Sequence, residues 1–369
     1  MNNLGIKSRL LKRLDAEIAA TQDLAPKSCL QVQRALIFVR HGHAAAAREQ
    51  LTAMHKLAFQ FPNPSLGAWL HFAEGLMSYY LDFSGDTREK VSRALTLARV
   101  TNLAPLVALC TAWLTQIAYV RNQPEEMLRW AHECDEIADP KNHGARYRLC
   151  TALALAHHYA GQTTTAQSWF MYAKCHAIDD GDDASLSALM YNMAEMRTAV
   201  ARRESLANIV VGKIGLLLGA DSIKHYDSVV GGSVNSHLTA VLRAQVLTVD
   251  GEFEQARELF ESHLPQTMSA RLARLGSSML ADLAWCRVNT GQREHALLQA
   301  RESELELDPS CDIDDRAATH SRLSQVYAML GDAEAAQRHA SLAAAEWREF
   351  AQQQQALATA LNASGLVPR

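Results

Sequence analysis

A hexapeptide pattern, G-x-x-E-x-A, occurs three times in the C-terminal part of the chain at a constant interval of 40 residues. The copies are GEFEQA, GQREHA and GDAEAA, which begin at Gly251, Gly291 and Gly331. A period in this range is typical of stacked supersecondary units. Because each such unit buries its apolar face against its neighbours, the period predicts an array of repeats.

The residues around each glycine predict two antiparallel helices joined by a tight turn. The position seven residues before the glycine is small in all three copies: Ala244, Ala284 and Ser324. The positions five and nine residues after it hold Ala256 and Phe260, Ala296 and Ala300, and Ala336 and Ala340. Residues four apart lie on one face of a helix. Small residues on that face let two helices approach closely, with the glycine in the turn.

This pattern, with Pro309 ending its unit, resembles the tetratricopeptide repeat. The resemblance extends over residues 28–350 as about eight units. It implies an all-α fold, a right-handed superhelical solenoid of antiparallel helix-turn-helix repeats. The turn positions are Gly42, Gly85, Asn122, Gly161, Gly251, Gly291 and Gly331. A degenerate unit between Gly161 and Gly251 is expected to form helices near 184–201 and 205–219.

The ends of the chain are expected to cap the array. Residues 1–27 contain a helical pattern near 6–20, which predicts an N-terminal capping helix. The array itself covers 28–350, and residues 351–363 are expected to form a C-terminal capping helix. Residues 364–369 end in LVPR, which resembles the remnant of a thrombin-cleavable tag.

Composition favours a helical protein with a neutral surface. Hydrophobic residues make up 48% of the chain and charged residues 21%, with a net charge of −4. No basic block indicates nucleic acid, and no apolar stretch is long enough to cross a membrane. Seven irregularly spaced cysteines without a secretory signal favour reduced thiols in the cytoplasm. Self-association into a homo-oligomer is plausible, since terminal repeats leave an apolar face.

The stretch ALIFVRHGHA raises a catalytic alternative. Arg40-His41-Gly42 after four apolar residues resembles the first-strand signature of the histidine phosphatases, in which the His attacks a phosphoryl group. That interpretation needs a strand at 35–39, whereas the repeat register places Gly42 at a turn and Ala35 seven residues before it. The register therefore predicts that Arg40 and His41 end a first helix, where cations favour the helix dipole.

Other polar clusters have structural explanations. The adjacent His157 and His158 point about 100° apart on a helix and do not share one metal ion easily. The acidic run at 179–183 lacks the alternating order of a calcium loop and is interpreted as a linker before a helix. The glycines of VVGGSVNS and GKIGLLLG lack phosphate-binding patterns; we interpret the first as a turn and the second as close helix packing. The sequence thus predicts no catalytic residue, metal or cofactor.

In tetratricopeptide repeats the positions thirteen, ten, six and three residues before the turn line a concave groove. Carried over to this sequence, the resemblance selects Tyr79, Asp82, Gln116, Tyr119, Arg148, His158, Tyr191, Glu195, Gln245, Trp285 and Gln325. Aromatic, Gln and Arg side chains suit an extended peptide. The family's clamp of two Lys and two Asn on a peptide carboxylate is not reproduced, which argues against a cochaperone role.

Two classes of function follow, neither of them enzymatic. The first is a scaffold that binds a protein or peptide segment in the groove. The second is a ligand- or peptide-sensing module of a bacterial signalling or transcription-control system, which the resemblance to helical-repeat sensor regions implies. A fold alone does not distinguish them.

Overall fold

The structure is a computed structural model that describes residues 4–82, 86–209, 215–230, 236–269, 273–309 and 311–368. These residues form α-helices joined by short turns, and they contain no β-strand. The chain divides into two compact units. Unit 1 comprises Met1–Leu189, Asp227–Val234 and Gln355–Arg369, and unit 2 comprises Met190–Tyr226 and Asn235–Gln354.

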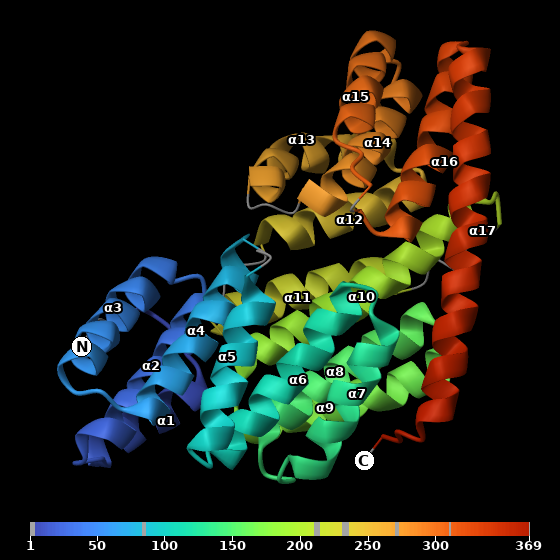
Figure 1. Ribbon diagram of the computed structural model, residues 1–369. Helices are drawn as coiled ribbons and strands as arrows, with labels where there is room; N and C mark the ends of the chain where they lie inside the picture. Colours follow the sequence, from blue (N-terminus) through green and yellow to red (C-terminus); the bar gives the residue numbers. More distant parts are fainter. Residues whose placement is uncertain are drawn as a thin grey trace. The chain divides into compact units, whose positions relative to one another are not determined.

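Unit 1 begins with a single helix, α1 (Arg9–Ala20), which packs against α2 through Leu11, Leu14 and Ile18. Four antiparallel helix pairs follow, and Figure 1 shows them as successive pairs from blue to green. They are α2 (Leu24–Arg40) with α3 (Ala44–Gln60), α4 (Pro64–Asp82) with α5 (Thr87–Val100), α6 (Ala104–Val120) with α7 (Pro124–Ile137), and α8 (His143–Tyr159) with α9 (Thr163–Asp180). We call the first member of each pair a first helix.

Unit 2 contains two further complete pairs and the first part of a third. They are α12 (Ser236–Asp250) with α13 (Phe253–Ser269), α14 (Ala273–Asn289) with α15 (Arg293–Leu305), and α16 (Ile313–Leu330) with α17 (Ala333–Ser364). Two helices precede them, α10 (Asp183–Leu206) and α11 (Leu216–Val230). Helices α10, α11 and α17 contribute residues to both units.

The predicted turns are confirmed wherever the structure describes them. A left-handed backbone lets the chain reverse after one helix and begin the next, and glycine adopts it without steric cost. The turn residues with positive φ are Gly42 (83°), Asn122 (52°), Gly161 (75°), Gly251 (83°), Gly291 (80°) and Gly331 (87°). Gly85 lies outside the described residues.

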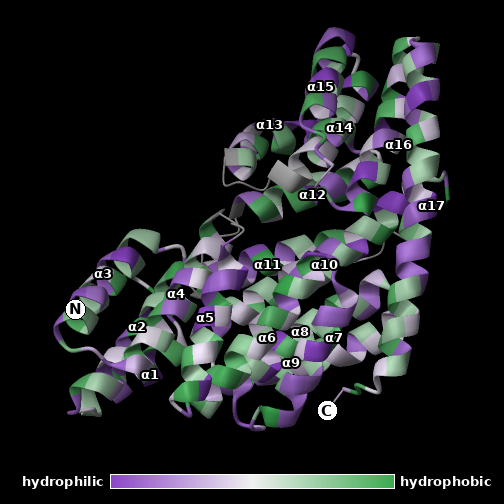
Figure 2. Ribbon diagram, viewed as in Figure 1, coloured by the Kyte–Doolittle hydropathy of each residue, from purple (hydrophilic) through white to green (hydrophobic). Residues whose placement is uncertain are grey.

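The small residues that flank the turns form the contacts between paired helices. Ala244 and Ala284 are fully buried, and so are Ala256 and Ala296 on the helices that follow. Larger apolar side chains fill the space between neighbouring pairs, with Phe72 and Phe260 fully buried. Figure 2 shows hydrophobic and hydrophilic residues on each helix, as expected for helices that bury one face.

The prediction for the degenerate unit was wrong in the position of its second helix. Helix α10 covers the expected 184–201 but continues to Leu206, and the chain turns at Asn208, whose φ is 57°. Helix α11 therefore begins at Leu216 and not near 205, because nothing at 201–205 stops a helix. The close packing expected at Gly212, Gly215 and Gly219 is found at Gly219, where a Cβ would lie 3.3 Å from the Cβ of Ala194, but not at Gly215, where a Cβ would meet nothing within 4 Å. Gly212 lies outside the described residues. Residues 231–235, in the expected glycine turn, lie outside the described residues.

The C-terminal helix is continuous. The stretch 351–363, expected to form a separate capping helix, continues α17, which ends at Ser364. Residues 333–364 contain no glycine or proline and are rich in good helix formers, so no sequence signal ends the helix at 350. The last residues of this helix belong to unit 1, where the Asn362 side chain accepts a hydrogen bond from the Gln162 side chain (2.9 Å).

Candidate functional site

Aromatic side chains from three first helices meet in unit 1. The Trp113 ring of α6 packs edge-on against the rings of Tyr79 and Tyr80 of α4, with centroids 5.1 and 5.8 Å apart. The guanidinium carbon of Arg148, on α8, lies 3.8 Å from the centroid of the Trp113 ring. Tyr147 adjoins Arg148, with its ring centroid 5.4 Å from the guanidinium carbon. We call these five residues the first-helix cluster.

The first-helix cluster joins two residues that the sequence predicted with three that it did not. Tyr79 and Arg148 were selected by the repeat register, whereas Tyr80, Trp113 and Tyr147 fall outside its four positions. Trp113 precedes the predicted Gln116 by three residues, and residues three apart share a helix face. That spacing was the signal that would have identified Trp113.

The other predicted residues of unit 1 lie on the same helices. Gln116 is buried on α6, and its Oε1 has no hydrogen-bond partner among the described residues. The Tyr119 hydroxyl donates to the carbonyl oxygen of Leu155 on α8 (3.4 Å), so Tyr119 connects two first helices. His158 is half-buried at the end of α8. Asp82 ends α4, and its side chain lies outside the described part of the structure.

Arg40 and His41 end a first helix, as the repeat register predicts, and the stretch 35–39 is helical. Arg40 Nη2 lies 2.5 Å from Asp182 Oδ2 and donates to the Ser185 hydroxyl (2.6 Å). Tyr147, in the first-helix cluster, donates to the carbonyl oxygen of Ser185 (2.9 Å). Burial and the neighbouring Arg40 lower the pKa of His41 to about 4. The triplet is therefore a structural contact between α2 and the α9–α10 turn.

A buried ionic cluster occupies the first helices of unit 2. Asp282, on α14, is fully buried between two arginines: its Oδ2 lies 2.6 Å from Arg202 Nε, and its Oδ1 accepts from Arg322 Nε (2.9 Å). The guanidinium of Arg322 also lies 5.1 Å from the Trp285 ring and donates to Gln325 Oε1 (2.7 Å). The predicted Trp285 and Gln325 thus share one partner, Arg322.

The remaining predicted residues belong to helices α10 and α12. Tyr191 and Glu195 are half-buried on α10, where burial and the neighbouring Asp314 raise the pKa of Glu195 to about 7. Burial and Glu195 also raise the pKa of Tyr191. Gln245 is half-buried on α12. Glu195 therefore titrates near neutrality.

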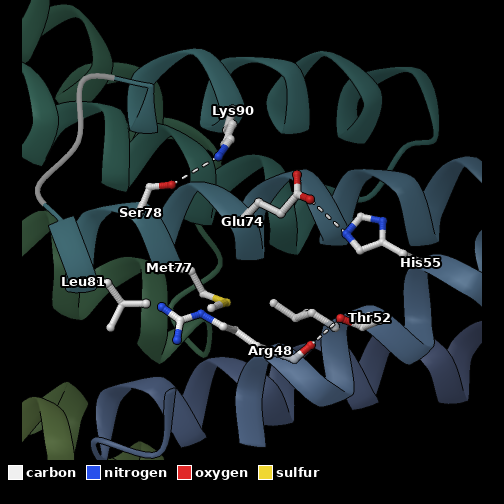
Figure 3. A pocket seen from close by; sticks show the side chains of 9 residues that line it. Arg48, Thr52, His55, Glu74, Met77, Ser78, Leu81 and Lys90 are labelled. Carbon is white, nitrogen blue, oxygen red and sulfur yellow. Dashed lines mark hydrogen bonds and ion pairs between the residues drawn. The ribbon is translucent and has the colours of Figure 1, made fainter. Parts of the chain in front are cut away.

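A second site in unit 1 is a pocket of about 360 Å³ between α3, α4 and α5 (Figure 3). Leu51, Met77 and Leu81 supply its apolar lining. His55 Nε2 lies 2.9 Å from Glu74 Oε1, and Lys90 Nζ lies 2.7 Å from Asp86 Oδ2 and donates to the Ser78 hydroxyl. Arg48 is exposed and extends toward Met77 and Leu81 in Figure 3. The charged side chains of the lining are thus two cations, Arg48 and Lys90, and one carboxylate, Glu74.

Histidines and acidic residues do not assemble a metal site in the described part of the chain, where no group of three His, Cys, Asp or Glu side chains has the necessary proximity. His157 Nδ1 contacts Gln162 Oε1 (2.5 Å), while His143 faces His176 with Nδ1 atoms 3.2 Å apart. In the acidic run, Asp182 contacts Arg40, and Asp183 Oδ2 accepts from the backbone N–H of Arg9 (3.4 Å).

Comparison with solved structures identifies the fold. A crystal structure of a Rap protein complexed with competence and sporulation factor superposes with a TM-score of 0.55 over 93% of this chain and 92% of that chain, at 9% sequence identity. No protein-family model matches the sequence, and no curated protein is similar to it. The chain has an all-helical repeat fold of the tetratricopeptide type. None of the described helices has the length and hydropathy of a transmembrane span.

Proposed function

We propose that this chain is a non-catalytic recognition protein that binds an extended peptide or protein segment on its first helices. The first-helix cluster is the observation that carries the proposal. It presents the half-buried Tyr79 and Tyr80 and an arginine stacked on the buried Trp113, at positions contributed by consecutive repeats. Rigid aromatic rings supply large contact areas at a small entropic cost, and arginine adds directional hydrogen bonds.

The chemistry of the described cysteines supports a role without catalysis. Burial raises the pKa values of Cys134, Cys150 and Cys286 to about 12, so their thiols stay protonated and unreactive at neutral pH. All seven cysteines are free, which is consistent with the cytoplasmic location that we include in this proposal. His41, the nucleophile that the phosphatase resemblance required, is buried next to Arg40.

A regulatory sensor is the second candidate, and the comparison favours it. The Rap protein with the same fold was crystallised with competence and sporulation factor, so a chain of this architecture accommodates a bound factor. If this protein is a sensor, binding changes a second property, such as its contact with an effector protein. A scaffold binds its partner without that consequence.

The binding proposal is tested by site-specific photo-crosslinking. We would replace Tyr79 with p-benzoylphenylalanine and irradiate the protein with a pool of random-sequence hexapeptides. The matched control carries the same residue in place of Phe59, an aromatic side chain on α3 that is 89% exposed. Both variants keep an aromatic ring at the substituted position, and circular dichroism verifies that each remains folded.

We expect the adducts at position 79 to carry recurring peptide sequences and to diminish when excess competing peptide is added. The adducts at position 59 should be weak and random in sequence. Equal labelling at both positions, or none at position 79, would refute peptide binding on the first helices. Mass spectrometry of the adducts reads out both their yield and their sequences.

A further inference from the structure

Among the described residues, Arg148 is a half-buried cation without an anionic partner. Its Nε is buried and makes no hydrogen bond there, and the one side-chain acceptor that its Nη2 reaches in this part of the structure is the Tyr80 hydroxyl, at 3.5 Å. No carboxylate forms an ion pair with it in the described part of unit 1. A guanidinium carries five N–H donors, so most of the hydrogen-bonding capacity of Arg148 is unused.

Neighbouring arginines show that the fold otherwise compensates such charges. Arg146, two residues earlier on α8, contacts Asp135 Oδ1 at 2.8 Å and two backbone carbonyls. Arg40 contacts Asp182 at 2.5 Å. Taking a charge out of water costs free energy unless an opposite charge or hydrogen bonds replace the water. Within the described part of the chain, Arg148 has only the rings of Trp113 and Tyr147 and the long contact to the Tyr80 hydroxyl to offset this cost, so its charge is compensated less than that of Arg146 or Arg40.

The stacking of Arg148 on Trp113 also orients it. With the guanidinium carbon 3.8 Å from the centroid of the indole ring, the ring covers one face of the guanidinium, and the Nη N–H donors lie along the edge of the guanidinium plane. A carboxylate fits that edge with two parallel hydrogen bonds.

We propose that Arg148, held flat by Trp113, binds a carboxylate of the peptide ligand. This inference rests on the proposed function and specifies its ligand. The carboxylate belongs either to an Asp or Glu side chain or to the C-terminus of the peptide. Both present the same planar pair of oxygens to the guanidinium.

The test uses affinity selection from three random hexapeptide pools: free C-termini with all residues, amidated C-termini with all residues, and amidated C-termini without Asp and Glu. The protein variants are wild type, Arg148→Gln, Arg148→Lys and Arg129→Gln. Arg129 is the matched control, because it stacks on Trp130 at 4.6 Å but contacts Glu126 and lies on a second helix. Circular dichroism verifies that each variant is folded.

We expect wild type and Arg129→Gln to retain peptides from the first pool and none from the third. Retention from the second pool assigns the carboxylate to an acidic side chain, and its loss assigns it to the C-terminus. For the selected peptides, Arg148→Gln is expected to weaken binding by roughly 10- to 100-fold. Arg148→Lys should bind with intermediate affinity, since an ammonium ion cannot form the bidentate pair.

Two results would overturn the inference and leave the proposed function standing. One is equal retention by wild type from the first and third pools, and the other is unchanged affinity in Arg148→Gln. If wild type retains no peptide from any pool, both the proposed function and this inference fail. In that case photo-crosslinking at position 79 should also yield no recurring adducts, because it detects bound peptides whatever their charge.

Discussion

Arg40 Nη2 lies 2.5 Å from Asp182 Oδ2, although the two residues are 142 positions apart in the chain. Arg40 is the last residue of α2, and Asp182 immediately precedes α10. The bond therefore joins the first helix pair of unit 1 to the turn that follows its last pair. Both side chains are mostly buried, with 18% and 10% exposure. Removal of one partner should leave the other charge buried and unpaired.

We predict that Asp182→Asn lowers the free energy of unfolding by about 3 kcal/mol at pH 7. The measurement is urea denaturation followed by circular dichroism. Asp180→Asn is the matched control, since Asp180 pairs with an Arg13 side chain that is 48% exposed, and its loss should cost less than about 1 kcal/mol. Similar losses in both variants would contradict the special role of the Arg40–Asp182 bond.

The same bond should depend on pH. Burial alone would raise the pKa of Asp182, but the charge and hydrogen bond of Arg40 outweigh it and hold the pKa below its ordinary value. A depressed carboxyl pKa stabilises the fold above the pKa of the unfolded chain, and this stabilisation is lost as the pH falls through the folded pKa. The difference between wild type and Asp182→Asn should therefore shrink below about pH 4.

Gly181→Ala tests the contact between α1 and the α9–α10 turn. Gly181 has a φ of 68°, and an added Cβ would lie 2.8 Å from the Cβ of Arg9. Gly161 is the matched control, since its φ is 75° but a Cβ there would meet nothing within 4 Å. Both substitutions incur the left-handed backbone cost of about 1 kcal/mol. We expect Gly181→Ala to lose roughly 1 kcal/mol more in urea denaturation, and equal losses would mean that α1 shifts freely.

Glu195→Gln is predicted to stabilise unit 2 at alkaline pH. Burial and Asp314 raise the pKa of Glu195 to about 7, so folding favours its protonated form. The stability that this form provides is complete below the unfolded pKa near 4.3 and declines as the pH rises through about 7. The advantage of the variant over wild type should therefore be roughly 2 kcal/mol larger at pH 8 than at pH 5.

Thermal or urea unfolding of Glu195→Gln at the two pH values provides the measurement. Glu258→Gln, at an exposed position on α13, is the control and should behave as wild type at both. A gain in stability that is the same at pH 5 and pH 8 would show that packing, and not the titration of Glu195, is responsible.

His320 belongs to a chain of hydrogen bonds in unit 2. Its Nδ1 lies 2.9 Å from Nδ1 of His339, whose Nε2 lies 2.6 Å from Glu304 Oε1. Because Glu304 accepts from the Nε2–H of His339, the Nδ1 of His339 is the acceptor and His320 is the donor. Burial and His339 lower the pKa of His320 to about 4. Protonation of His320 in the folded protein is thus unfavourable.

This arrangement predicts an acid-sensitive fold. A depressed histidine pKa stabilises the protein above the unfolded value near 6.5, and the stabilisation is lost as the pH falls from there through about 4. Wild type should lose about 2 kcal/mol between pH 7 and pH 4 that His320→Gln does not lose. His295→Gln, exposed on α15, is the control in the same denaturation series. Identical pH profiles for wild type and His320→Gln would disprove the prediction.

The architecture was predictable because its signals are local. The turn at Gly331 depends on a residue that adopts a left-handed backbone, and the contact beside it depends on alanines a few positions away. Such patterns repeat at each unit, so one clear copy identifies weaker ones such as the unit around Asn122. The prediction failed where the pattern was absent, at the end of α10 and the beginning of α11.

The sequence by itself also selected two members of the first-helix cluster, Tyr79 and Arg148, because the repeat register specifies which positions share a helix face. Only the tertiary structure decided what these residues contact. The stacking of Arg148 on Trp113 and the bond between Arg40 and Asp182 join residues 35 and 142 positions apart. Such contacts depend on the rotation and spacing of packed helices, which arise from the sum of many side-chain contacts and not from a local pattern.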